Sequence, residues 1–429
     1  MSRVSLSCSR KMGYVHCKLV CRIPNSGQNY YNAGLEGWTI LLNLLSGTVV
    51  FLTLAPVLVL FAQVMLAATG RGKSSTAVGR GRLAIIMPAH DEALGITATL
   101  RALIPQLAPR DRLIVVADNC SDDTANVARR EGAEVIVRTD TARRGKGFAL
   151  DFGVRHLESD PPDIALIVDA DCEVTPGALG ALAAACSSTG HPVQALYLMH
   201  APPNAGLKTR IAEFAWVLRN QVRPLGQQRL GMPCQLMGSG MAFPWECLRT
   251  SALATGHIVE DLKLGIDLAR AGHAPSFCPE ALVTSRFPDS PSGVQSQRTR
   301  WEHGHLGLIF REAPRLLLES VLRGRPALLA LALDLSVPPL ALLALALVLV
   351  WLAALALYAL TAAAVPLALT TLGVVLFGAT VLTAWWRFAR HVVAFTSLAL
   401  APVYVLWKIP LYVKFLVSRQ IDWVRSKRG

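Results

Sequence analysis

Charged residues are scarce in this chain of 429 residues, because Asp, Glu, Lys and Arg together make up only 17% of it. Soluble globular domains usually contain about 25% of these residues. Hydrophobic residues make up 52%, and the longest apolar stretches run from Trp38 to Ala68 and from Pro326 to Trp386. Sequence of ordinary globular composition lies between them. We therefore expect a soluble domain held between membrane segments.

Acidic residues are also few, with 29 Asp and Glu against 42 Lys and Arg, so the formal net charge is +13. A basic excess can serve nucleic acid, anionic lipid or an anionic substrate. We find no nucleic-acid-binding module and therefore expect no nucleic-acid partner. Many basic residues instead flank the apolar segments: Arg71, Lys73, Arg80, Arg82, Arg323, Arg325, Arg387, Arg390, Arg425, Lys427 and Arg428. Positive charge beside a membrane span marks its cytoplasmic side, which predicts a multi-pass inner-membrane protein with a cytoplasmic globular domain.

Cysteine does not form a disulfide framework in this chain. The nine cysteines include single, scattered residues in the middle of the sequence, which is typical of a reducing compartment. Cys8, Cys17 and Cys21 cluster near His16, but their spacing matches no zinc module.

The apolar segments also predict how the chain is divided. The run at 38–68 exceeds the roughly 20 residues that cross a bilayer, and two further spans are expected near Pro339–Leu360 and Leu367–Trp386. The basic N-terminus conflicts with an external location, so either the other flank of the first span dominates or translation starts later, for which Met12 is a candidate. The expected segments are a disordered stretch (1–37), a transmembrane helix (38–68), a linker (69–82), a cytoplasmic domain (83–325), two spans (326–391), and an interfacial or transmembrane helix with a basic tail (392–429).

Short apolar strands alternate with helical patterns after residue 82. This alternation predicts an α/β fold, a mainly parallel sheet with helices on both faces. Ligands bind such sheets at the C-terminal ends of the strands. The expected strands are 83–87, 113–117, 135–138 and 164–168, and the expected helices are 95–106, 122–131, 147–157 and 176–186.

Polar motifs follow several of these strands. The segment from Pro88 to Glu92 follows the first strand, and Asp118 to Thr124 follows the second. A carboxylate there can accept hydrogen bonds from a uracil N–H or from ribose hydroxyls. Ser121 and Asp122 could instead cap the next helix.

Asp169-Ala170-Asp171 follows the most apolar strand, at 164–168. Two carboxylates in such close spacing repel each other unless something neutralises them. A divalent cation does so by binding carboxylate and diphosphate oxygens together. The pattern predicts a site for Mg²⁺ or Mn²⁺.

Two later motifs each have a functional and a structural interpretation. Glu260-Asp261 could supply a general base or favourable negative charge at a helix N-terminus. In Gln297 to Trp301, arginine suits a diphosphate and tryptophan offers a face for a sugar ring. The same residues could belong to an amphipathic helix at the membrane surface.

Taken together, these motifs resemble those of glycosyltransferase family 2, in particular its membrane-bound branch of cellulose and poly-N-acetylglucosamine synthases. The resemblance covers about residues 83–310 and implies an A-type glycosyltransferase fold, an inverting mechanism and a UDP-sugar donor. It implies that Asp261 is the catalytic base and that Asp169 and Asp171 bind the metal. The implied nucleotide-sugar ligands are Pro88, Glu92, Asp118, Lys146 and Asp169, and the implied acceptor or diphosphate ligands are Gly240, Glu260, Gln297, Arg300 and Trp301.

The acceptor remains open at this point. A saccharide acceptor would place the protein in exopolysaccharide or cell-surface polysaccharide synthesis, with other assembly or export proteins as partners. The alternative is single transfer to a lipid, as in ceramide glucosyltransferase. The expected membrane part is shorter than in polymer synthases, which argues against export of a polymer by this chain alone. A non-enzymatic transporter or scaffold would not need carboxylates at strand ends.

Overall fold

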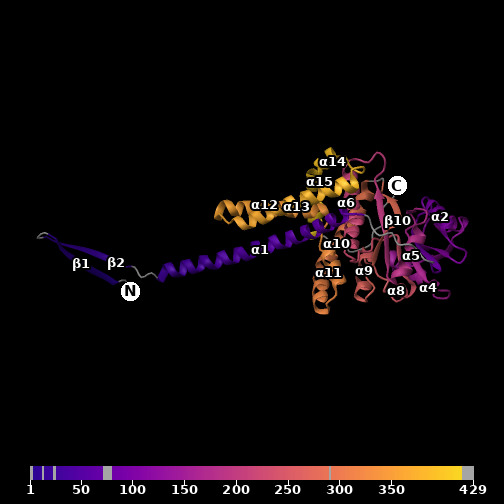
Figure 1. The fold of residues 1–429 in the computed structure, drawn as a ribbon, viewed down its shortest axis with the longest axis horizontal. Coiled ribbons are helices and arrows are strands. Elements are labelled where there is room, and N and C mark those ends of the chain that lie inside the picture. Colours follow the sequence, from indigo (N-terminus) through magenta and orange to yellow (C-terminus); the bar gives the residue numbers. More distant parts are fainter. Residues whose placement is uncertain (1–2, 12–13, 23–25, 71–79, 289–290, 418–429) are drawn as a thin grey trace.

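The computed structural model describes residues 3–11, 14–22, 26–70, 80–288 and 291–417. An α/β domain forms one end of the molecule, and three long helices, α1 (Ser26–Ala68), α12 (Leu340–Thr361) and α13 (Ala364–Ala384), extend from it to one side (Figure 1). The hairpin of β1 (Arg3–Lys11) and β2 (Tyr14–Arg22) lies at the far end of α1.

An eight-stranded sheet with the order β5-β4-β3-β6-β9-β8-β10-β7 forms the centre of the α/β domain. Six strands run in one direction, and β9 and β7 run opposite to their neighbours. The prediction of a mainly parallel sheet is confirmed. The strands are β3 (Leu83–Ala89), β4 (Arg112–Asp118), β5 (Glu134–Arg138), β6 (Ile164–Ile167), β7 (Glu173–Val174), β8 (Val193–His200), β9 (Met241–Pro244) and β10 (Ser276–Arg286).

Helices cover both faces of this sheet, which explains why its central strands are apolar throughout. Leu83, Ile85 and Met87 of β3 belong to one buried cluster, whereas Ala84 and Ile86 belong to the cluster on the other face. The first cluster includes residues of α2, α3 and α5, and the second includes residues of α4, α8 and α9. The helices of this part are α2 (Ile96–Leu103), α3 (Thr124–Arg130), α4 (Lys146–Leu157), α5 (Ala178–Thr189), α6 (Leu207–Val217), α7 (Arg223–Arg229), α8 (Trp245–Arg249), α9 (Glu260–Arg270), α10 (Pro291–Arg323) and α11 (Pro326–Leu335).

Within the part of the chain that the structure describes, three helices are long and apolar enough to cross a membrane: the segments 44–68, 340–361 and 364–389. They correspond to the three spans expected from the sequence. α12 and α13 form a hairpin, and both lie beside α1 (Figure 1). Gly373 of α13 helps the helices approach, because a Cβ there would lie 3.1 Å from Leu54 of α1 and 3.2 Å from Leu347 of α12.

Both ends of the chain differ in detail from the expectation. We expected 1–37 to be disordered, yet β1 and β2 pair with Leu6 opposite Leu19 and Cys8 opposite Cys17, and α1 begins at Ser26. The physical cause is visible in the sequence, since apolar and polar residues alternate in both strands. The described part of 392–429 forms three short helices, α14 (Phe395–Ala399), α15 (Ala401–Trp407) and α16 (Ile409–Val417), and its basic tail lies outside the described residues.

A buried ion pair and a close helix contact join the spans to the α/β domain. Arg223 of α7 donates to Asp334 of α11, with 2.7 Å between Nη2 and Oδ1. Gln63 of α1 donates to the same Asp334 oxygen over 2.8 Å. Gly226 of α7 packs so closely on α1 that a Cβ there would overlap the Gln63 carbonyl group. The membrane helix and the domain are therefore one packed unit at this point.

Candidate active site

Nearly all the site residues predicted from the sequence line one cavity of about 500 Å³ at the C-terminal ends of β3, β4 and β6. Its volume is within the range of small-molecule sites. Gly240 is the exception, because its neighbours are instead Ala195 and Val283 in the packed sheet, and its φ of +67° requires glycine. The predicted residues that line the cavity are Pro88, Glu92, Asp118, Lys146, Asp169, Asp171, Glu260, Asp261, Gln297, Arg300 and Trp301.

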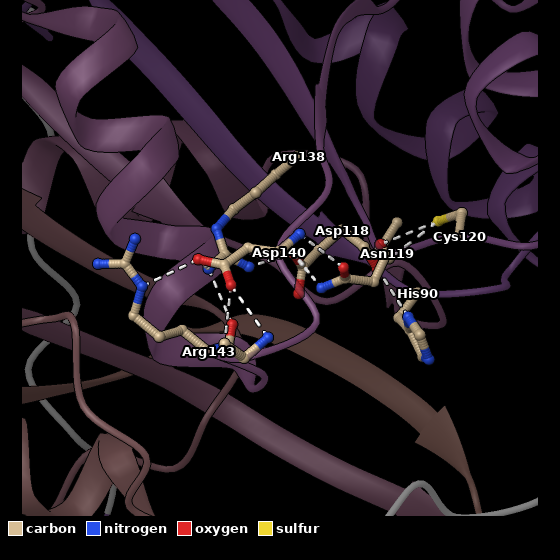
Figure 2. Close-up of polar contacts among 9 residues, drawn as sticks. His90, Asp118, Asn119, Cys120, Arg138, Asp140 and Arg143 are labelled. Carbon is tan, nitrogen blue, oxygen red and sulfur yellow. Dashed lines mark hydrogen bonds and ion pairs between the residues drawn. The ribbon is translucent and has the colours of Figure 1, made fainter.

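The loops after β3 and β4 hold each other in place at one edge of this cavity. Asp91 and Asn119 have positive φ angles of 54° and 51°, a conformation that Asp and Asn tolerate better than most residues. The Asp91 carboxylate accepts a 2.6 Å hydrogen bond from the Ser121 backbone N–H. His90 Nδ1 lies 2.7 Å from the Asp118 carbonyl oxygen (Figure 2).

Asp122 contacts the start of the next helix, as the structural interpretation of the sequence predicted. Its carboxylate accepts the Thr124 backbone N–H at the start of α3 over 3.0 Å, and its other oxygen accepts the Ala93 N–H over 3.0 Å. These contacts satisfy donors at a helix start and join the two loops. Asp122 therefore positions the loop rather than facing a ligand.

Asp118 is buried and paired with a cation from the neighbouring strand. Arg138 of β5 donates to Asp118 Oδ1 over 2.5 Å, and Asn119 Nδ2 donates to the same oxygen over 3.0 Å (Figure 2). Arg138 is itself oriented by Asp140 and by the Arg143 carbonyl oxygen. Asp118 thus lies at the edge of the cavity with its carboxylate held in place by Arg138 and Asn119.

Lys146 begins α4 and connects two sides of the cavity. Its Nζ lies 2.5 Å from Asp169 Oδ1 and donates to the Gly238 carbonyl oxygen over 2.5 Å. Burial alone would lower the pKa of Lys146, but the carboxylates of Asp169 and Glu260 outweigh it and raise the pKa above its ordinary value. Lys146 is therefore a permanent cation inside the cavity.

Asp169 and Asp171 follow β6, as the sequence predicted, and their side chains converge. Oxygens from both carboxylates and the Cys172 sulfur lie within 4.8 Å of one another. The Cys172 thiol is buried and accepts a hydrogen bond from Ser239 Oγ over 3.2 Å. Because Mg²⁺ and Mn²⁺ prefer oxygen ligands, the two carboxylates are the donors that fit such an ion here.

Glu260 and Asp261 form the first turn of α9, which begins at Glu260. Burial raises the pKa of Glu260 to about 7, and the neighbouring Asp261 adds to the rise while Lys146 opposes it. Burial also raises the pKa of Asp261, and Lys146 again opposes the shift. Glu260 and Asp261 are therefore candidates for proton transfer, because carboxyl groups with a raised pKa in a cavity are typical of functional sites.

Aromatic side chains form the opposite wall. Trp301 of α10 packs against Trp216 of α6 with 4.9 Å between ring centroids. Trp216 also meets Tyr197 edge-on and donates from Nε1 to the Tyr197 carbonyl oxygen over 3.1 Å. The Gln297–Trp301 segment therefore faces the cavity, and the alternative of a surface helix does not hold for Gln297, which is buried.

Sequence reasoning missed Arg219, Asn220 and Trp216, which line the same cavity. Arg219 lies in the π-helical turn Leu218–Val222 that follows α6, a type of irregularity frequent at functional sites. Burial lowers the pKa of Arg219, with a further contribution from Arg223. The sequence signal for Arg219 as a site residue was its position as a single arginine directly after the apolar run Phe214–Leu218.

The part of the chain that forms the cavity matches a known protein family. A family model described as glycosyltransferase like family 2 matches residues 81–304. The probable glycosyltransferase YdaM of Bacillus subtilis is 24% identical over 242 residues, 54% of this chain and 56% of that protein. The chain thus spans about half the length of this relative. The uncharacterized glycosyltransferase Mb0553 of Mycobacterium bovis is 31% identical over 192 residues, 41% of this chain and 81% of that protein.

Solved structures also match, with low sequence identity. The mannosyltransferase PcManGT from Pyrobaculum calidifontis, solved with GDP-Man and Mn²⁺, is 17% identical, with a TM-score of 0.49, over 88% of this chain and 100% of that one. Glucosyl-3-phosphoglycerate synthase from Mycobacterium tuberculosis, solved with Mn²⁺ and UDP-glucose, is 23% identical, with a TM-score of 0.37, over 54% of this chain and 78% of that one.

Proposed function

Because the chain belongs to glycosyltransferase family 2, we propose that it transfers a sugar from a nucleotide sugar, a UDP-sugar by preference, to a hydroxyl group presented at a membrane surface. One observation carries this proposal. Asp118, the Asp169–Asp171 pair, Lys146 and Asp261 come from different elements and meet in one cavity. These residues could contact the nucleoside and the diphosphate of a donor, and Asp261 could accept a proton from the acceptor hydroxyl.

The donor end of the cavity lies between the loops after β3 and β4 and the Asp169–Asp171 pair. Asp118 can accept hydrogen bonds from uracil or ribose, and Lys146 and Arg300 supply positive charge for a diphosphate. Asp169 and Asp171 would hold Mg²⁺ or Mn²⁺, which when bound neutralises charge on the diphosphate leaving group. Lys146, which lies beside Asp169, would be placed to contact the phosphates as well.

Asp261 is the proposed base. It lies beside Gly238, where a Cβ would be 3.3 Å from Asp261 Oδ2 and 3.9 Å from Lys146 Nζ. In a single displacement, the acceptor oxygen bonds to the anomeric carbon as the bond from that carbon to the diphosphate breaks. The acceptor proton passes to the Asp261 carboxylate, and the nucleoside diphosphate departs. The anomeric configuration is inverted.

The acceptor approaches from the side of the spans. Trp216, Arg219 and Trp301 line the cavity and also border a second chamber next to α12 and α13. A catalytic domain packed on membrane helices is suited to a membrane-bound acceptor. We retain extension of a cell-surface polysaccharide as a second candidate role, because the Gln297–Trp301 segment and its aromatic wall offer a stacking face for a sugar.

The proposal is tested by measuring release of nucleoside diphosphate from purified full-length protein. UDP-glucose, UDP-N-acetylglucosamine, UDP-galactose and GDP-mannose are compared with Mg²⁺ or Mn²⁺ and with EDTA. We expect metal-dependent release from one donor, reduced by about 10²-fold or more in Asp169→Asn and Asp171→Asn. Glu158→Gln, which changes an exposed carboxylate after α4, serves as the control. A rate of nucleoside diphosphate release that is unchanged by EDTA and by both substitutions would overturn the proposal.

A further inference from the structure

A second chamber of about 190 Å³ lies between the catalytic domain and the spans. All three candidate spans contribute to its lining, through Leu60 of α1, Ala344 of α12 and Val381 of α13. Phe214 of α6 and Phe377 of α13 add aromatic surface. Its walls are mostly apolar, so it offers few partners for the hydroxyl groups of a saccharide.

This chamber adjoins the catalytic cavity. Trp216, Arg219 and Trp301 line both spaces. Trp301 and Trp216 are in contact with each other, so they form a shared aromatic wall between the two spaces. A molecule that occupies the chamber therefore ends beside the cavity that contains Asp261.

Several cations line the chamber, and most have partners. Arg223 pairs with Asp334, and Lys408 pairs with Glu302. Arg298 donates to the Lys208 carbonyl oxygen and lies over the Tyr404 ring. Arg219, at the junction, makes no hydrogen bond or ion pair with the residues that the structure describes. Its side chain lines both spaces, and its positive charge interacts with the carboxylates of Asp261, Asp334 and Glu302 without a hydrogen bond to them.

We propose that the chamber holds the hydrocarbon chain of a lipid acceptor, whose anionic headgroup lies at Arg219 and whose acceptor group reaches the catalytic cavity. The inference rests on the proposed function and specifies its acceptor. An apolar chamber that borders all three candidate spans suits an acyl or prenyl chain, and a guanidinium with no hydrogen bond to the described residues suits a phosphate or carboxylate. The protein then adds its sugar to a membrane lipid.

The test uses photolabelling of the full chain in lipid nanodiscs, with dodecyl phosphate that carries a diazirine in its alkyl chain as the probe. We expect label in the peptides that contain Leu340–Ala344 and Phe377–Val381. Ala344→Trp fills the chamber and should reduce this label at least 10-fold. Ala353→Trp places the same side chain on the exposed part of α12 and should leave the label unchanged.

Arg219→Gln tests the headgroup. Wild-type protein should prefer dodecyl phosphate over the corresponding dodecanol probe by 10-fold or more, Arg219→Gln should remove that preference, and Arg219→Lys should restore part of it. Should Ala344→Trp fail to bind nucleotide, Val381→Trp replaces it. The positions of the label in the wild-type protein test the inference even if neither tryptophan variant folds.

Label on the outer faces of the helices alone, or equal label in both tryptophan variants, would overturn the inference. If the protein releases nucleoside diphosphate but is not labelled in the chamber, the lipid-acceptor inference is wrong and the proposed function still stands. If the chamber is labelled but the protein shows no metal-dependent release of nucleoside diphosphate, the proposed function is wrong. A water-soluble polymer as the sole product would also overturn the lipid assignment.

Discussion

At the scale of single residues, the charge of Lys146 organises the cavity. It contacts Asp169 on one side and the carbonyl of Gly238 on the other, and its field acts on both Glu260 and Asp261. The same cation therefore influences the diphosphate end and the base. Burial raises the pKa of Asp261, and Lys146 limits that rise.

This arrangement makes the pH dependence of transfer a test of Lys146. A base works only when deprotonated, so kcat/KM should rise with pH through the raised pKa of the buried carboxyl pair, of which Glu260 titrates at about 7. Lys146→Met removes the cation that opposes the rise, so the pKa of both carboxyl groups increases and the ascending limb moves to higher pH. Lys263→Met, which removes a cation that pairs with Asp267 on the same helix, should move the limb less than Lys146→Met does. A limb that stays fixed or moves to lower pH in Lys146→Met would contradict this role.

Most residues of the cavity could be predicted because they follow strands in the chain. Asp118, Asp169 and the Pro88–Glu92 segment each come directly after an apolar run, and parallel strands bring such positions to one edge. Arg219 and Trp216 could not be found in this way, since they lie on a helical segment whose position depends on packing against β8 and the spans. The family resemblance implied Gly240 as an acceptor ligand, but its close contacts with Ala195 and Val283 give it a packing role.

At the scale of elements, the contact between α1 and α7 joins the first span to the catalytic domain. Gly226→Ala would force a Cβ against the backbone of Gln63, and we expect a loss of about 1–3 kcal/mol in unfolding free energy. Gly180→Ala in α5 meets nothing within 4 Å and should be neutral or stabilising by up to ~1 kcal/mol. Thermal unfolding in detergent compares the two. Equal transition temperatures would show that the contact is looser than described.

The first four strands and their helices were predictable from local pattern, because apolar runs alternate with helical periodicity between residues 83 and 186. The second half of the sheet was not. β9 inserts between β6 and β8 and runs antiparallel to both, and pairing between residues so distant in the chain leaves no local signal. The β1–β2 hairpin did have such a signal in its alternating residues.

At the scale of the whole molecule, three candidate spans define a topology. With one span before the catalytic domain and two after it, the domain and the C-terminal helices lie on the same side, and we propose that this side is the cytoplasm. Leu360, beside the turn between α12 and α13, is 85% exposed and belongs to the other side.

Cysteine labelling in intact cells tests this topology in a background with Cys8, Cys17 and Cys21 changed to Ser. A membrane-impermeant maleimide should label Leu360→Cys in intact cells. It should label Thr250→Cys, on the catalytic domain, only after permeabilisation. The described natural cysteines are buried or half-buried and should give little background. The reverse pattern would place the catalytic domain outside.

The most direct test of the central claim is the effect of Asp261→Asn on sugar transfer and on donor binding. The substitution keeps the shape of the side chain but removes the proton acceptor, so transfer should fall by about 10²–10⁴-fold while the affinity for the nucleotide sugar stays within a few-fold. Asp267→Asn, on the exposed side of the same helix, should retain full transfer. Near-normal turnover in Asp261→Asn would contradict the account.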